Sequence, residues 1–151
     1  MNDEQEKQKI REVIAEWSRA SADGDLDRIL NLMAEDVIFL MPGQPPMRGR
    51  DTYAAAFRSA IGKVRIEATG DIQEIHIAGD YAFCWSQLTV TVTPTTAGLP
   101  ERLSVFSKEF VRNAPLQWTT RRAGSVLSIF RREPDGRWVL FRDANMLTGI
   151  E

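Results

Sequence analysis

The chain has 151 residues, of which 43% are hydrophobic and 26% charged, and a net charge of −2. This composition is typical of a folded globular domain rather than a disordered segment. The charge balance argues against nucleic-acid and anionic-membrane partners, and no apolar run approaches the roughly 20 residues of a membrane span. A single cysteine and a single histidine exclude an internal disulfide and a multi-histidine metal site within the chain. We expect one cytoplasmic domain over residues 1–151, because the first residues are charged rather than signal-like, and no cofactor.

An amphipathic helix is predicted at the start of the chain. Apolar residues recur at helical spacing from Asp3 to Ala22, which is the stripe of a helix that buries one face. Asp3 and Glu6 resemble a capping box at the first turn. Gly24 suits the C-terminal cap.

A short helix, a short strand and a third helix should follow. Asp25 is the expected N-cap of the second helix, whose apolar stripe extends to Met33. Val37 to Met41 is typical of a short buried strand. Asp51 is the expected cap of the third helix, after a loop rich in proline and glycine.

The rest of the chain predicts β structure. Val64 to Ile77, with a bulge near Gly70, and Tyr81 to Thr93 should form a hairpin that turns at residues 79–80. Leu103 to Val111 is expected to be a further strand.

The last two strand-like runs predict an antiparallel hairpin. Gly124 to Arg132 and Arg137 to Leu147 flank a Pro-Asp-Gly turn at residues 134–136. Helices in the first third and a meander of strands afterwards predict an α+β fold, in which three helices pack on one face of a curved antiparallel sheet.

Alternation sorts the last hairpin into two faces that both carry apolar residues. One face has Val126, Ser128, Phe130, Val139, Phe141, Asp143 and Asn145, and the other has Leu127, Ile129, Arg131, Trp138, Leu140 and Arg142. Asp143 and Asn145 are polar groups at the end of an otherwise apolar stripe. A buried carboxylate is costly unless it is paired, so these two residues are the first candidates for a site.

The second apolar face of the sheet predicts a homodimer. Three helices can cover one face only, and packing against a second copy would bury the other. The expected convex interface consists of Leu88, Val90, Leu127, Ile129 and Leu140.

Four short segments carry a family resemblance. They are Gly24-Asp25-Leu26-Asp27, Ala34-Glu35-Asp36-Val37, the loop from Pro42 to Asp51, and Arg131 to Trp138. Together they resemble the nuclear transport factor two-like, or SnoaL-like, superfamily, which includes ketosteroid isomerases and SnoaL-type cyclases, and they are most similar to its SgcJ/EcaC-type proteins. The resemblance implies a cone-shaped, cystatin-like fold with the helices on the concave face of the sheet around a conical pocket.

The same resemblance tests the ketosteroid isomerase chemistry. By motif alignment, the three catalytic positions of those isomerases fall on Trp17, Met41 and Ser128. None of these residues supplies the phenol, the carboxylate base or the carboxylic acid donor of that reaction. The resemblance therefore supports the scaffold and leaves open whether the protein is an enzyme.

The register implied by the resemblance places a set of residues in the pocket. The candidate catalytic residue is Asp143, and the candidate substrate-binding residues are Trp17, Met41, Phe57, Trp85, Gln87, Ser128, Phe141 and Asn145. For the aromatic residues the alternative is a purely structural core. For Asp143 it is a structural pair with an arginine or with backbone donors. Tyr53 would either reach the pocket mouth through its hydroxyl or belong to the helix core.

The functional hypothesis is a homodimeric, cofactor-free protein that binds a small, largely apolar organic molecule. Isomerisation, cyclisation and hydrolysis are the candidate reactions. The alternative is a noncatalytic dimerisation or binding module with a vestigial pocket. A cavity of a few hundred Å³ reaching Asp143 would favour the first hypothesis.

Overall fold

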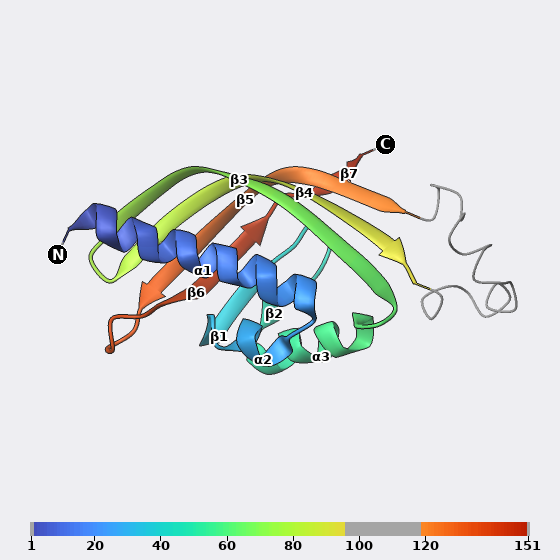
Figure 1. The fold of residues 1–151 in the computed structure, drawn as a ribbon, viewed down its shortest axis with the longest axis horizontal. Coiled ribbons are helices and arrows are strands. Elements are labelled where there is room, and N and C mark those ends of the chain that lie inside the picture. The colour runs from blue at the N-terminus through green and yellow to red at the C-terminus, as the bar shows by residue number, and fades with distance from the viewer. Residues whose placement is uncertain (1, 96–118, 151) are drawn as a thin grey trace, which may run out of the picture.

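The computed structural model describes residues 2–95 and 119–150, and Figure 1 shows their arrangement. The elements are α1 (Asp3–Asp23), α2 (Leu26–Leu30), β1 (Met33–Leu40), β2 (Met47–Arg48), α3 (Arg50–Ala60), β3 (Val64–Ala78), β4 (Tyr81–Pro94), β5 (Thr120–Arg132), β6 (Trp138–Asn145) and β7 (Thr148–Ile150). The strand expected from Leu103 to Val111 lies outside the described residues. Among the helices described, none has both the length and the apolar character that crossing a lipid bilayer requires.

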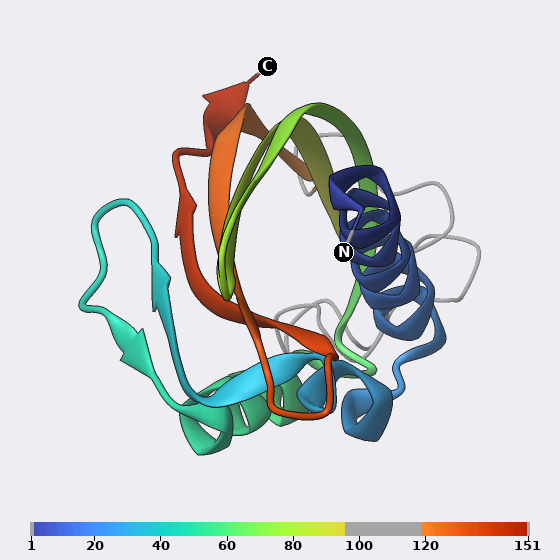
Figure 2. The same cartoon turned by 90° about the vertical axis from the view of Figure 1, so that its left-hand side faces the viewer.

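The strands form one curved sheet in the order β2-β1-β6-β5-β4-β3, and β7 pairs with β5. Figure 2 shows this curvature, with α1 beside β3 and the short helices near β1. The predicted combination of α+β elements, a curved sheet and three helices is confirmed. The prediction of a wholly antiparallel sheet is wrong, because β1 runs parallel to β6. The long intervening chain sets no direction for this pair, whereas a tight turn forces its two strands to be antiparallel.

The ends of α1 are capped by polar contacts from its flanking residues. Asn2 is the N-cap, and its side-chain oxygen accepts a hydrogen bond from the backbone N–H of Glu4 at 2.8 Å. The predicted capping box at Asp3 and Glu6 is therefore wrong by one position, since Asp3 already lies inside the helix. Gly24 closes the helix with φ of 67°, as predicted, because this left-handed conformation suits glycine.

The second and third helices differ from prediction at their boundaries. Asp25 caps α2 as expected, by accepting from the backbone N–H of Arg28. The helix does not reach Met33, which is fully buried at the start of β1. The N-cap of α3 is Gly49 rather than Asp51. The carboxylate of Asp51 lies in the first turn of the helix, where it interacts favourably with the positive end of the helix dipole.

Both predicted hairpins are present, and each contains a β-bulge. In β3 and β4 the register shifts between Ile72 and Glu74, a few residues beyond Gly70, near which a bulge was predicted. In β5 and β6 the pairing passes from Arg142 to Leu140, so Phe141 is the extra residue of the bulge. An extra residue reverses the alternation of the strand beyond it.

The core lies between the helices and the side of the sheet that faces α1, which we call the concave face. Ile10 of α1 and Ile29 of α2 belong to one buried cluster with residues of the strands, including Ile75, Cys84 and Phe130. The N-terminal part of α1 is attached to β6 by a buried hydrogen bond, in which the indole N–H of Trp138 donates to the carboxylate of Glu6 at 2.6 Å. The opposite side of the sheet is the convex face.

Candidate functional site

Three neighbouring rows of side chains cross the concave face. They are Ile77, Ala82, Phe130, Leu140 and Met33; then Ile75, Cys84, Ser128, Asp143 and Phe39; then Ile72, Ser86, Val126 and Asn145. The first row is apolar, and the polar residues gather in the second and third. The structure thus brings together Asp143, Ser128 and Asn145, three of the residues that the sequence singles out.

Asp143 is a mostly buried carboxyl with one hydrogen bond. Its Oδ1 accepts from the hydroxyl of Ser128 at 2.7 Å, and within the part of the chain that the structure describes it forms no ion pair. Burial raises the pKa of Asp143 from 3.8 to about 6, and the hydrogen bond from Ser128 lowers it in part. The arginine partner considered as a structural explanation is therefore absent from the described residues.

Asn145 closes the polar group at the end of β6. Its side-chain oxygen accepts from the backbone N–H of Leu147 at 3.3 Å, where the chain turns toward β7. This bond fixes the orientation of the amide and leaves its NH₂ group available to a ligand.

An aromatic cluster lies beside these polar groups, because Phe39 is the neighbour of Asp143 in the second row. Phe39 of β1 stacks on Tyr53 of α3 at 5.2 Å between ring centroids, and Tyr53 stacks on Phe57 at 6.2 Å. Trp17 of α1 meets the edge of the Tyr53 ring at 5.9 Å. Trp17 and Phe57 thus lie on the concave side, together with Tyr53. Phe39 was not among the predicted site residues, although its alternation with Val37 along β1 was a signal that could have found it.

Tyr53 is electrostatically linked to Asp143. Burial first, and the nearby carboxylate of Asp143 second, raise the pKa of Tyr53 to about 12. The phenol therefore stays protonated at physiological pH and can donate a hydrogen bond.

Three of the predicted site residues lie on the wrong face for this site. Trp85 and Gln87 project from the convex face, where Gln87 donates to the hydroxyl of Ser125. Phe141 lies there as well, with the guanidinium of Arg142 3.8 Å from its ring centroid. Phe141 was assigned to the wrong face because the bulge reverses the alternation of β6. Trp85 and Gln87 were assigned to the wrong face because both faces of β4 carry apolar residues, so composition did not show which face is the inner one.

The remaining predictions concern the ends and the outside of the sheet. Met41 is half-buried just beyond the end of β1. Leu88, Val90 and Leu140, predicted on the convex interface, belong to the concave side by their register, and Leu140 is only 5% exposed. Cys84 is buried on the concave side too, and burial raises the pKa of its thiol.

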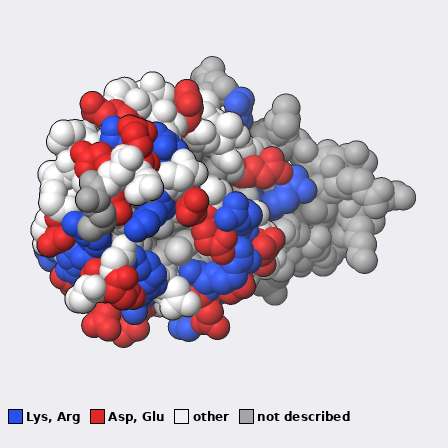
Figure 3. All heavy atoms as spheres, turned by 60° about the vertical axis from the view of Figure 1, so that its left-hand side comes forward, with Lys and Arg blue, Asp and Glu red and all other residues white. Residues whose placement is uncertain are grey.

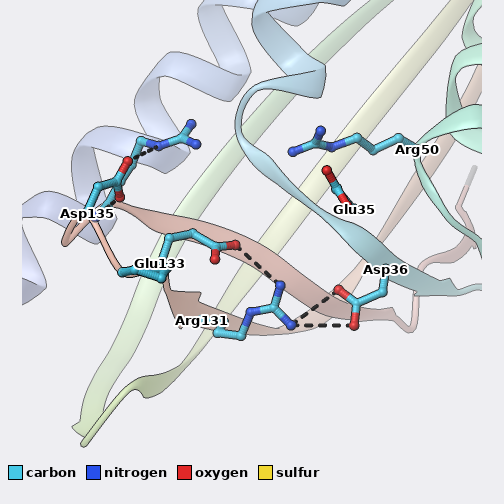
Figure 4. A pocket seen from close by; sticks show the side chains of 8 residues that line it. Glu35, Asp36, Arg50, Arg131, Glu133 and Asp135 are labelled. Carbon is cyan, nitrogen blue, oxygen red and sulfur yellow. Dashed lines mark hydrogen bonds and ion pairs between the residues drawn. The ribbon is translucent and has the colours of Figure 1, made fainter.

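Two surface hollows lie away from Asp143. The larger, of about 660 Å³, is lined by Glu35, Asp36, Arg50, Arg131, Glu133, Pro134, Asp135 and Arg137. Figure 4 shows Arg131 between Asp36 and Glu133, with which it forms ion pairs of 3.2 and 3.3 Å. The second, of about 420 Å³, lies between α1 and the turn of the last hairpin. Figure 3 shows acidic and basic side chains interspersed on the described surface of one side, so no field of a single charge extends over it.

No group of three or more metal-ligating side chains is placed to hold an ion among residues 2–95 and 119–150. The described residues of the concave side offer hydrogen bonding, and proton exchange at Asp143, within an aromatic wall.

Comparison with known proteins identifies similar chains. The family model for the SnoaL-like domain matches residues 14–141. A conserved protein from Planctomyces limnophilus is 31% identical, with a TM-score of 0.80, over 97% of this chain and 99% of that chain. A ketosteroid isomerase-like protein from Erwinia carotovora atroseptica is 20% identical, with a TM-score of 0.68 and 94% of both chains covered. A nuclear transport factor 2-like superfamily protein from Salmonella enterica serovar Typhimurium is 17% identical, with a TM-score of 0.71, over 99% of this chain and 94% of that chain.

Proposed function

Because this chain belongs to the SnoaL-like domain family, we propose that it binds a small, largely apolar organic molecule on its concave face and uses Asp143 as the acid–base group there. The observation that carries this proposal is the environment of Asp143. The carboxyl is mostly buried beside an aromatic wall, and a serine hydroxyl is its only hydrogen-bond partner among the described residues. A site made of apolar walls and a few convergent polar groups is the usual form of a small-molecule site.

Polar atoms without partners support a ligand at this place. In the described part of the chain, neither the second carboxylate oxygen of Asp143 nor the amide nitrogen of Asn145 has a hydrogen-bond partner. No fully buried side-chain nitrogen or oxygen lacks a partner among the described residues, so these atoms retain accessible surface. They are therefore free to meet a ligand.

The pKa of Asp143 suits proton exchange near neutral pH. A carboxyl with a pKa of about 6 is mostly ionised at pH 7 and is a stronger base than an ordinary aspartate. We propose a reaction in which it removes or returns a proton: isomerisation, cyclisation or hydrolysis of a small apolar substrate.

A noncatalytic binding module is the second candidate. It is favoured by the motif alignment, which puts Trp17, Met41 and Ser128 where ketosteroid isomerases have their catalytic groups. The two surface hollows described, of about 660 and 420 Å³, also do not include Asp143. In this alternative the concave side binds a ligand without converting it, or serves only as a core.

We further propose that the convex face joins two copies of the chain. Two neighbouring rows cross this face, namely His76, Phe83, Ile129, Arg142 and Ile38, and Glu74, Trp85, Leu127, Ala144 and Leu40. Phe83, Leu127 and Leu40 are 36%, 39% and 45% exposed. Apart from His76, Glu74 and Arg142, the residues of the two rows are apolar and form a contiguous strip, which supports an interface between sheets.

The binding proposal is tested by screening hydrophobic metabolites for ligand-induced NMR shifts with the wild type, Asp143→Asn and Asp71→Asn. We expect a ligand that shifts resonances of Trp17 and Phe57 in the wild type. Asp143→Asn should abolish turnover and the dependence of binding on pH near 6. Asp71 is an exposed carboxylate on β3, so Asp71→Asn should change neither. A ligand whose shifts lie away from Trp17 and Phe57, or unchanged turnover in Asp143→Asn, would contradict the proposal. Binding without conversion of any ligand would favour the second candidate.

A further inference from the structure

We propose that Tyr53 is a specificity residue of this site and that it selects ligands carrying a hydrogen-bond acceptor, such as a carbonyl oxygen. This inference rests on the proposed function. It adds a residue from α3 to a site whose other polar groups come from β5 and β6, and it defines the class of ligand.

The position of Tyr53 places its ring against Phe39, a neighbour of Asp143. Phe39, which stacks on Tyr53 at 5.2 Å, is the register partner of Asp143 on the adjacent strand. Phe57 also stacks on the Tyr53 ring, and Trp17 forms an edge contact with it. The surrounding rings hold the phenol in one orientation and offer it no strong hydrogen-bond acceptor.

Tyr53 and Asp143 are both neighbours of Phe39 on the concave side. The charge of Asp143 is near enough to affect the ionisation of the phenol, yet no hydrogen bond joins the two side chains or satisfies the hydroxyl within the described residues. The hydroxyl retains accessible surface, because every fully buried polar side-chain atom of the described residues has a partner. Two groups of opposite hydrogen-bonding character, each able to form a further hydrogen bond, therefore lie around Phe39 on the concave side.

The two groups make complementary demands on a ligand. The neutral phenol donates, and the ionised carboxyl accepts. A molecule that fits both presents an acceptor to Tyr53 and an acidic C–H or O–H group to Asp143. A site built to form such a bond discriminates against an analogue that lacks the partner atom, because its own polar group is then left unpaired.

The test compares two probes of nearly the same shape. Acetonaphthone carries a carbonyl oxygen, and isopropylnaphthalene replaces this group with a hydrocarbon branch. Dissociation constants for both would be measured by NMR titration with the wild type and Tyr53→Phe, which keeps the ring and removes only the hydroxyl. Tyr81→Phe is the matched control, because Tyr81 is 46% exposed on the convex face.

We expect Tyr53→Phe to weaken acetonaphthone about 3- to 10-fold, the range of one net hydrogen bond, and to leave isopropylnaphthalene unchanged. Tyr81→Phe should affect neither probe. Equal weakening of both probes in Tyr53→Phe would assign the tyrosine to packing alone and overturn the inference, as would no change for acetonaphthone. Failure of both probes to bind the wild type at Trp17 and Phe57 would instead count against the proposed site itself.

Discussion

At the scale of single residues, burial raises the pKa of Asp143 from 3.8 to about 6, so the folded chain holds a proton where the unfolded chain has already lost it. The folded state then binds more protons than the unfolded state between these two pH values, and stability falls as pH rises through them. A shift of about two units corresponds to about 3 kcal/mol. This stabilisation is fully present below pH 4 and lost above pH 6.

We predict that Asp143→Asn removes this pH dependence. The amide oxygen can still accept from Ser128, so the variant should be as stable as the wild type at pH 4 and more stable by about 2–3 kcal/mol at pH 7.5. Urea unfolding at both pH values measures the difference. Tyr53 and Cys84, the titratable groups influenced by Asp143, both have raised pKa values and stay neutral in this window. A variant less stable than the wild type by 3 kcal/mol at pH 7.5 would show that Asp143 has a structural role.

At the scale of elements, the site depends on where the chain turns back after β6. β7 pairs with β5, and the segment that leads to it crosses β5 closely at Gly124. A Cβ atom at Gly124 would lie 2.5 Å from the carbonyl oxygen of Met146. Because that oxygen belongs to the backbone, it cannot move away as the end of a flexible side chain could. This crossing places Leu147 where its backbone N–H donates to Asn145.

We predict that Gly124→Ala destabilises the chain by about 1–3 kcal/mol, the usual cost of overpacking, and perturbs the amide of Asn145. Thermal unfolding and the NMR shift of the Asn145 side-chain amide are the measurements. Gly149→Ala on β7 is the control, because a Cβ atom there meets nothing within 4 Å. Equal stability of the two variants would show that the crossing is not tightly packed.

The alternation of side chains along the strands explains which site residues the sequence could predict. Asp143 and Asn145 follow the bulge in β6, and Ser128 is the partner of Asp143 on β5. All three lie on the same side of the bulge, so simple alternation assigned them to one face. Beyond Phe141 the same alternation fails, because one extra residue reverses the faces. A bulge leaves no reliable mark in the sequence, and β4 carries apolar residues on both faces, so only the packed structure decides which of them face inward.

At the scale of the whole molecule, the order of elements was readable because turn residues separate strongly periodic segments. The direction of β1 and the existence of β7 were not readable. Both depend on contacts between segments distant in sequence, which no local pattern specifies. The resemblance to the SgcJ/EcaC branch and the assignment of one domain to residues 1–151 stay predictions.

The final prediction concerns the assembly of two molecules. Leu127 lies at the centre of the convex apolar strip, between Trp85 and Ala144 on the neighbouring strands. An interface related by two-fold symmetry contains every residue twice, so Leu127→Asp would introduce two charges that lose their hydration on association. Loss of a buried leucine alone costs about 1.5–3 kcal/mol, and an unpaired buried charge adds to this. We therefore expect the dimer dissociation constant to rise at least about 100-fold.

Sedimentation equilibrium of the wild type, Leu127→Asp and Ile61→Asp tests this assembly. Ile61 is 51% exposed just beyond α3, so its substitution adds the same charge away from the convex face and should preserve the dimer. Leu140 is unsuitable for this test, because it lies in the core and its replacement by aspartate would unfold the chain. A monomeric wild type, or a Leu127→Asp variant that keeps the dimer mass across the concentration range, would exclude this interface and leave the exposed strip to a different partner.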